Sequence, residues 1–199
     1  MKLALLTPFP PEEDRIPGGV HGVAASLVRE FRKSRDVEIL VLHCHSEIPA
    51  TRILTDGNVT IRFIAPRPTR LPLRTATAVS RLAEELRAFE PDVVHAHQPH
   101  YAVAGLASGF PTLYTIHGLA GREAGIRTAP AAHRLSNALL AFYDRRAVRR
   151  ARHLAAISPY VIREYRGRTR ARWHLVDNPV ADEFFALRRE GGPGRILFA

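Results

Sequence analysis

A strand–helix–strand pattern at the start of the chain restricts its possible folds more than any other feature. Lys2 to Leu6 is a short apolar run that ends at Thr7-Pro8, as in a buried strand. From Val20 to Phe31, apolar residues recur every three or four positions, which predicts an amphipathic helix. A second apolar run, Val37 to Leu42, follows closely. Two strands joined through a helix in this way lie parallel, with a right-handed crossover.

The alternation of strands and helices continues to Val176. Further strands are predicted over Val59–Ile64, Val93–Ala96, Thr112–Ile116, His153–Ile157 and Trp173–Val176, and further helices over Ala76–Phe89, Tyr101–Ala107, Pro130–Arg150 and Pro159–Tyr165, the last with Ser158 as its N-cap. The residues of the long helix that we expect to face the core are Leu135, Leu139, Phe142 and Ala147. This order predicts an α/β fold: a Rossmann-like, doubly wound, mostly parallel sheet with helices on both faces.

The last residues of the sequence have the pattern of a linker followed by the start of a second domain. A segment from Asp177 runs to the turn at Gly191–Gly194, and Arg195–Ala199 has the pattern of a new buried strand. We therefore expect residues 1–176 to form one Rossmann-like domain, residues 177–194 to be an interdomain linker, and residues 195–199 to begin a second domain that is truncated here.

The composition is that of a folded protein without a disulfide framework. Hydrophobic residues make up 46% of the 199, enough for a sizeable core. The apolar runs are too short to span a membrane, and prolines follow Leu6 so closely that we expect no secretory signal peptide. The single cysteine, Cys44, fits a reducing compartment, and we expect its thiol to be inert. These features favour a cytoplasmic protein, which can lie peripherally at the inner membrane face.

The positive charge is concentrated in the second part of the sequence. The formal net charge is +10, but residues 1–120 contribute only +1. From Arg122 to Arg172 there are 13 arginines against three acidic residues. Such a run is often a solvated surface, yet this concentration favours an anionic partner: a membrane surface, a phosphorylated substrate or nucleic acid. Sparse aromatic residues argue against single-stranded nucleic acid. One alternative function is a non-catalytic Rossmann-like module that binds nucleic acid or another polyanion through Arg122–Arg172.

Glycines between the first predicted strand and the first predicted helix indicate a phosphate site. Gly18, Gly19 and Val20 lie where the helix begins, and glycine lets the backbone approach an anion that helix-start amides attract. The alternative is a turn that needs positive φ. A dinucleotide-binding domain of the dehydrogenase type is a further alternative, but it would have an acidic residue after the second strand, where this chain has His43-Cys44-His45.

Histidines gather at the predicted ends of strands. His95, His97 and His100 form a His-x-His-x2-His pattern, His117 follows a later strand, and His21 lies in the first turn after the glycines. Imidazole binds transition metals, but nearby carboxylates or cysteines to complete a site are lacking, so we expect no metal. Because the carboxyl ends of parallel strands form the ligand-binding edge of an open α/β sheet, these histidines are candidates for substrate contacts.

The ordered set of motifs resembles the N-terminal domain of a GT-B glycosyltransferase of family 4. The segments that carry the resemblance are Lys2–Pro8, Pro17–Val20, Pro91–His97, Tyr114–Gly118, Ala156–Ser158 and Asp177–Val180, in the order that the family uses. From the first of these segments to the last, the resemblance extends over nearly the whole chain. The resemblance implies two Rossmann-like domains that close over a cleft, with the acceptor held mainly by the N-terminal domain and the nucleotide-sugar by the other.

The family resemblance also implies roles for individual residues. Gly18, Gly19 and Val20 would lie near the diphosphate of a nucleotide-diphosphate sugar donor, and catalytic His117 would approach the transferred sugar or the acceptor hydroxyl. The residues expected to contact the acceptor are Phe9, His21 and His97. The implied reaction retains the anomeric configuration and transfers a hexose to a lipid-linked, anionic or small-molecule acceptor, with no bound cofactor and no metal. A possible partner of the arginines is an anionic membrane surface.

Overall fold

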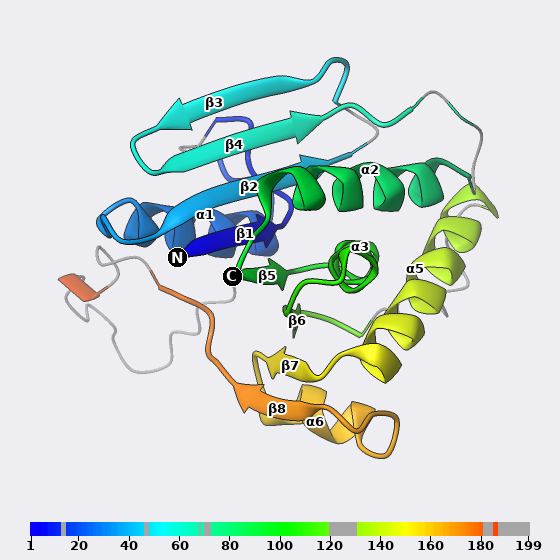
Figure 1. Ribbon diagram of the computed structural model, residues 1–199. Coiled ribbons are helices and arrows are strands. Elements are labelled where there is room, and N and C mark those ends of the chain that lie inside the picture. Colours follow the sequence, from blue (N-terminus) through cyan, green and yellow to red (C-terminus); the bar gives the residue numbers. More distant parts are fainter. Residues whose placement is uncertain are drawn as a thin grey trace, which may run out of the picture.

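The computed structural model describes residues 1–12, 15–45, 48–67, 69, 73–119, 131–180 and 185–186. Among these residues, eight strands form one sheet in the order β3-β4-β2-β1-β5-β6-β7-β8 (Figure 1). The strands are β1 Lys2–Leu6, β2 Glu38–Cys44, β3 Arg52–Asp56, β4 Val59–Ile64, β5 Val93–Ala96, β6 Thr112–Ile116, β7 His153–Ala156 and β8 Arg172–Leu175. The helices are α1 Gly19–Phe31, α2 Leu73–Phe89, α3 Pro99–Ser108, α5 Ala131–Arg150 and α6 Pro159–Tyr165.

Strand β1 lies in the middle of the sheet and pairs in parallel on both sides. Leu6 is in register with Leu42 of β2 on one side and with Ala96 of β5 on the other. The chain first builds outward through β2 and β4, then returns past β1 and continues through β5, β6, β7 and β8. All of these pairings are parallel, and the β3–β4 pair is antiparallel. The predicted mostly parallel, doubly wound α/β sheet is confirmed.

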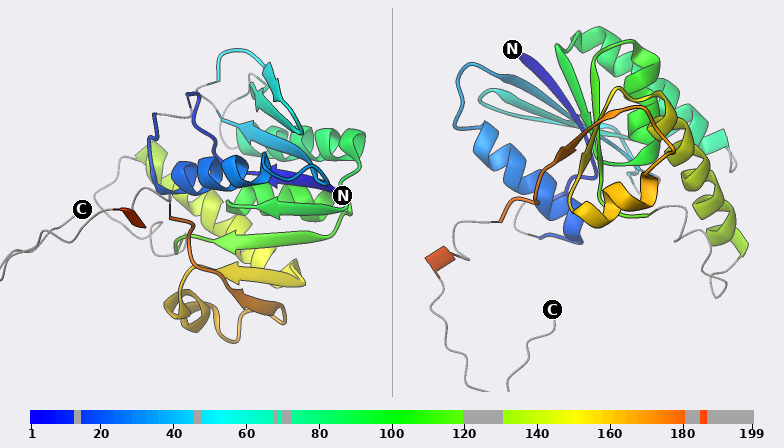
Figure 2. Two further views of the ribbon diagram at one scale, coloured as in Figure 1. Left: turned by 90° about the vertical axis from the view of Figure 1, so that its left-hand side faces the viewer. Right: turned by 90° about the horizontal axis from the view of Figure 1, so that it is seen from below.

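Helices cover both faces of the sheet because alternate residues of the central strands are apolar. Leu5 of β1 packs in a core with Val28 of α1, whereas Leu6 packs in the opposite core with Leu82 of α2 and Tyr101 of α3. Figure 2 shows α1 on one side of the strands and α2 and α3 on the other. This arrangement follows from right-handed crossovers, since a helix that leads to the left of β1 and one that leads to the right must lie on opposite faces.

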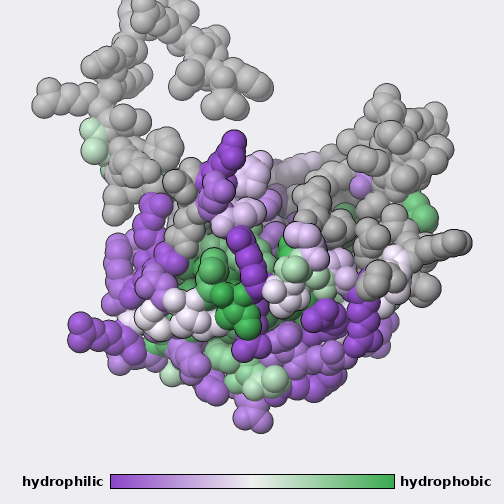
Figure 3. Space-filling model, turned by 90° about the horizontal axis from the view of Figure 1, so that it is seen from above, coloured by the Kyte–Doolittle hydropathy of each residue, from purple (hydrophilic) through white to green (hydrophobic). Residues whose placement is uncertain are grey.

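Strand β3 was not predicted, because its sequence lacks the pattern of a half-buried strand. All five of its residues are exposed, and it lies at the edge of the sheet beside β4 alone. The hairpin between them turns at Gly57, whose φ of 58° is easy only for glycine. Figure 3, drawn from the β3 side, shows hydrophobic surface between hydrophilic regions, and Ile53 and Leu54 of β3 are exposed.

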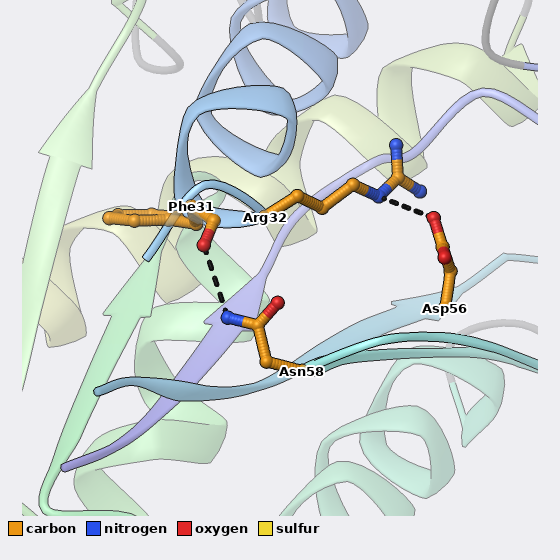
Figure 4. Close-up of polar contacts among 4 residues, drawn as sticks. All are labelled: Phe31, Arg32, Asp56 and Asn58. Atoms are coloured by element: carbon orange, nitrogen blue, oxygen red, sulfur yellow. Dashed lines mark hydrogen bonds and ion pairs between the residues drawn. The ribbon is translucent and has the colours of Figure 1, made fainter. Parts of the chain in front are cut away.

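The hairpin is fastened to the end of α1 by polar contacts (Figure 4). The Asn58 side-chain amide donates toward the carbonyl oxygens of Phe31, Ser34 and Val37 at 3.1, 2.7 and 2.7 Å. Beside it, Arg32 Nε lies 3.1 Å from Asp56 Oδ2. One side-chain amide thus joins the β3–β4 turn to the last residue of α1 and to the loop that follows it, where the Phe31 carbonyl also accepts from the Ser34 amide.

The buried face of α5 differs from the prediction. Leu135 and Phe142 are 50% and 51% exposed, so the expectation that they face the core is wrong. Ala147 is buried as predicted and Leu139 packs partly buried against the core, and Asp144 is buried beside them. The prediction failed because Asp144, a polar residue, occupies a core position that apolar periodicity does not register. The exposed arginines of this helix are Arg145, Arg146, Arg149 and Arg150.

Other predicted boundaries can be compared directly with the structure. Ser158 is the N-cap residue of α6, as predicted, but its side chain makes no capping hydrogen bond. Most of the predicted linker 177–194 and all of residues 195–199 lie outside the described residues. Among the helices of the described part of the chain, none is long and apolar enough to cross a membrane.

Gly105 of α3 predicts a stability effect, because it marks the closest approach of this helix to the sheet. A Cβ there would lie 2.9 Å from Thr112 of β6 and from Val94 of β5. We expect Gly105→Ala to lower the free energy of unfolding by about 1–3 kcal/mol in urea titrations, in spite of the better helix propensity of alanine.

Gly22→Ala is the matched control for this substitution. Gly22 also lies within a helix, α1, but a Cβ there would meet Ile16 at 3.5 Å, an ordinary contact. This variant should be as stable as the wild type or more stable by up to about 1 kcal/mol. A Gly105→Ala protein that matched or exceeded wild-type stability would contradict the close packing of α3.

Candidate functional site

A cleft of about 940 Å³ opens at the carboxyl ends of the central strands. Its lining includes His21, His43, His45, Gln98, His100 and Tyr101. These residues come from the start of α1, from the end of β2 and from the segment that follows β5. They therefore surround the point where the strand order reverses beside β1, which is where open α/β sheets bind their ligands.

His43 holds the wall of the cleft together through the backbone of Phe9. Its Nδ1 lies 3.2 Å from the amide nitrogen and 3.0 Å from the carbonyl oxygen of Phe9. The rings of His21 and His45 lie 6.2 and 6.1 Å from the His43 ring. The end of β2, the segment after β1 and the start of α1 are thus brought together around one imidazole.

Tyr101 forms the floor of the cleft and connects α3 to β2. Its hydroxyl accepts a hydrogen bond from the Cys44 amide and donates one to the Cys44 carbonyl, both at 3.2 Å. The thiol of Cys44 is buried, and burial raises its pKa to about 11. The thiol therefore remains protonated near neutral pH, as expected of an inert cysteine.

A second group of histidines lies at the ends of β5 and β6. His95 Nε2 lies 2.7 Å from Thr115 Oγ1, and the rings of His95 and His97 are 4.4 Å apart. His97 Nδ1 lies 3.3 Å from His117 Nε2. His97 is only 3% exposed, and its backbone amide donates to Leu6 at the end of β1. This group is a buried row of imidazoles that ends at the half-buried His117.

Burial keeps these imidazoles neutral. Burial, together with a smaller effect of neighbouring histidines, lowers the pKa of His43 and of His95 to about 4 and that of His100 to about 3. Burial also lowers the pKa of His97 and His117. A neutral imidazole donates one hydrogen bond and accepts another, so these histidines offer paired donors and acceptors. Arg15 adds a positive charge to the lining of the cleft.

The structure separates the expected acceptor residues. His21 lines the cleft. Phe9 is buried with its ring against Phe63, and it contributes to the site through its backbone. His97 lies behind the surface and contacts His117. The roles assigned to these residues and to His117 stay predictions, but their positions at one edge of the sheet agree with the expectation from strand order.

The glycines before α1 are not required by the backbone. Gly18 has φ of −179°, an extended conformation open to any residue, and Gly19 is the first residue of the helix. A Cβ at Gly19 would meet no atom within 4 Å. The alternative of a turn with positive φ is therefore wrong, and the open space at Gly19 leaves the amides at the start of α1 accessible. In the described part of the chain, no group of three His, Cys, Asp or Glu side chains is placed to hold a metal ion.

Sequence reasoning missed several residues of the cleft. From the sequence, His43 and His45 were considered only as neighbours of Cys44, and Gln98 was not considered. The signal that could have found them is their position, because His43 lies at the end of β2, His45 follows β2 and Gln98 follows β5. Polar residues after neighbouring parallel strands reach the same edge of the sheet.

A comparison with protein families shows to which family the chain belongs. The sequence pattern of Glycosyltransferase Family 4 matches residues 17–184, most of the chain. The chain belongs to Glycosyltransferase Family 4. No curated protein matches it in sequence.

Solved structures confirm the fold of this Family 4 chain. A sucrose-phosphate synthase from Thermosynechococcus elongatus superposes with a TM-score of 0.61 at 13% identity, over 88% of this chain and 47% of that one. A UDP-GlcNAc 2-epimerase from Methanocaldococcus jannaschii superposes with a TM-score of 0.51 at 13% identity, over 86% and 45%. The likeness to GT-B structures shows a Rossmann-like GT-B domain, and the Family 4 chain spans about half the length of each.

The buried histidines predict that the protein loses stability in acid. In the folded state the pKa of His43 is about 4, and in the unfolded chain it returns to 6.5, so the unfolded state binds more protons between these values. The free energy of unfolding should be fully retained above about pH 6.5 and should fall as the pH drops towards about 4. Urea titrations at about pH 7 and about pH 5 should show this fall, and equal stability at both would contradict neutral imidazoles.

His43→Gln isolates one of these groups. It should reduce the slope of unfolding free energy against pH by up to about 1.4 kcal/mol per pH unit, the effect of one proton. A slope equal to that of the wild type in His43→Gln would contradict the assignment of this proton uptake to His43.

Proposed function

We propose that this chain is the acceptor-binding domain of a retaining glycosyltransferase that uses a nucleotide-diphosphate sugar and transfers a hexose. The observation that carries the proposal is the histidine-lined cleft at the point where the strand order reverses, in a chain of Glycosyltransferase Family 4. The cleft has the position that open α/β sheets use for ligands, and its volume suits a sugar-sized molecule.

The chemistry of the cleft suits an acceptor rich in hydroxyl groups. His21, His43 and His100 offer imidazoles whose pKa values are lowered by burial, and Gln98 offers an amide. Each of these groups can donate and accept a hydrogen bond, as a hydroxyl does. A hydroxyl that finds both partners binds with more discrimination than one that faces a single charge.

The start of α1 is our proposed position for the donor diphosphate. The amides that follow Gly18 have no partners within the helix, and the helix dipole attracts negative charge there. The described first turn of α1 contains no acidic residue that would repel a diphosphate. In the transfer, charge develops on the leaving diphosphate as the sugar becomes oxocarbenium-like, so amides aimed at the diphosphate stabilise the transition state.

His117 is our proposed contact to the transferred sugar or to the acceptor hydroxyl. Its lowered pKa keeps it neutral, and its contact with His97 restricts the orientation of the ring. Arginines beyond residue 122 extend the proposal to a lipid-linked or anionic acceptor at the inner face of a membrane, where an anionic surface would attract the exposed positive charge. Catalysis would need a second domain that binds the donor. Closure of the two domains would exclude water from the reacting sugar.

The requirement for a second domain gives the first test. The chain of 199 residues is incubated with nucleotide-diphosphate sugars and a panel of hydroxyl acceptors, and product is measured by mass spectrometry. We expect no transfer, because the donor is held mainly by the second domain in this proposal. Robust turnover by this chain alone would show that the two-domain proposal is wrong.

His117→Ala gives the second test, in a protein that carries this chain together with a donor-binding domain. We expect kcat to fall about a hundredfold or more, as for the loss of a group that contacts the reacting centre, while the thermal midpoint changes little. His153→Ala, at an exposed histidine far along the sheet from the cleft, should retain wild-type kcat. Activity of His117→Ala within a few-fold of wild type would remove His117 from the mechanism.

A further inference from the structure

A hollow of about 340 Å³ lies between α5 and the loop that follows α6, away from the cleft. Its lining consists of Arg145, Val148, Arg149, Tyr165, Gly167 and Arg168, and we call it the arginine hollow. Three of these six residues are arginines, and none of the described lining residues is a carboxylate. The arginine hollow shares no lining residue with the histidine-lined cleft described above.

The loop that supplies Arg168 is fixed to α5 by hydrogen bonds. Thr169 Oγ1 donates to the Val148 carbonyl at 2.6 Å and accepts from the Ala171 amide at 3.0 Å. Gly167, with φ of 77°, turns the chain, and the Arg168 amide donates to the Tyr165 carbonyl at 3.0 Å. Arg168 therefore lines the hollow together with Arg145 and Arg149, which are one helical turn apart on α5.

Tyr165 forms a rigid base for the arginine hollow. It is buried, and its hydroxyl donates to Asp144 Oδ2 at 2.6 Å, while Tyr114 donates to Asp144 Oδ1 at 3.0 Å. The Arg168 guanidinium lies 6.0 Å from the centre of the Tyr165 ring. The Asp144 carboxylate is thus satisfied by two phenols below the surface. It lines a neighbouring hollow, together with Glu164, rather than the arginine hollow.

Positive charge is concentrated here without a close ion pair among the described residues. The Asp144 carboxylate of the neighbouring hollow attracts Arg145 and Arg168 electrostatically, and Arg149 has no such interaction with it. The ion pairs between described residues are Arg32–Asp56, Lys33–Glu30, Arg62–Glu85 and Arg67–Glu84, all before residue 90. Arg145, Arg149 and Arg168 take part in none of them. Three guanidinium groups around one hollow repel each other, and an oxyanion between them would relieve this repulsion. The planar guanidinium fork matches the oxygens of a phosphate.

We propose that the arginine hollow binds a phosphate group. The same chemistry is found on a soluble phosphorylated molecule and on the headgroup of an anionic lipid, and the hollow is large enough for either group. Hydrogen bonds hold the loop in place before binding, so little ordering is required when the phosphate enters. Its residues lie outside the cleft, so phosphate binding here does not depend on the transfer reaction, but a lipid headgroup in the arginine hollow would give the membrane contact of the proposed function a defined position.

The test is a calorimetric titration of the chain with inorganic phosphate at constant ionic strength. We expect one saturable site, with affinity reduced about tenfold or more in Arg149→Gln and in Arg168→Gln, since each removes hydrogen bonds to a charged group. Arg170→Gln is the matched control: it removes the same charge from the same loop, but Arg170 does not line the hollow. This control should bind phosphate within about twofold of wild type.

Sedimentation with vesicles distinguishes the two sources of phosphate. A lipid headgroup is assigned if the wild type sediments with phosphatidylglycerol vesicles but not with phosphatidylcholine vesicles, and if Arg168→Gln does not sediment with phosphatidylglycerol vesicles. Phosphate binding without retention on either vesicle would assign a soluble phosphorylated ligand. The proposal is overturned if no saturable phosphate binding is found, or if Arg170→Gln weakens it as much as Arg168→Gln does. The proposal is also overturned if no phosphate site is found and all three variants bind a single-stranded oligonucleotide more weakly by the same factor. That result would indicate that the arginines act only as diffuse positive charge.

Discussion

The parallel pairing of β1 on both of its sides is the constraint on which the rest of the structure depends. With β2 on one side and β5 on the other, the chain must reverse its direction of growth at β1. Right-handed crossovers then force α1 to one face and the later helices to the other, so no helix of the described residues covers the carboxyl ends of the central strands. The cleft is a consequence of this topology, and the histidines occupy an opening that the sheet creates in any case.

The strong apolar patterns of the sequence predict most of this architecture, and the failures have physical causes. Strand β3 was missed because an edge strand exposed on both faces has no hydrophobic alternation to detect. The buried face of α5 was misplaced because Asp144, hydrogen-bonded by two tyrosines from other elements, replaces an apolar residue there. Both depend on contacts between residues distant in sequence, which local periodicity does not contain.

The candidate site could be predicted in position but not in detail. Strand order placed His21 and His117 at the correct edge, yet the burial of His97 and the backbone role of Phe9 depend on side-chain packing. The neutrality of the histidines also depends on packing, because desolvation lowers each pKa. A histidine-rich sequence with net charge +10 therefore folds so that burial lowers the pKa of imidazoles such as His95 and His97, while the arginines at the end of α5 remain exposed on another surface.

The tyrosine–aspartate–tyrosine contact has a consequence for how this chain can change in evolution. Tyr114 of β6, Asp144 of α5 and Tyr165 of α6 share two hydrogen bonds inside the core. Replacing the aspartate by an apolar residue removes the acceptor of these two hydrogen bonds, and replacing one tyrosine by phenylalanine removes one of the two phenolic donors to a buried carboxylate. A substitution at one of these three positions therefore destabilises the protein until the other two positions are also substituted. In homologous chains we expect the three residues to be replaced together.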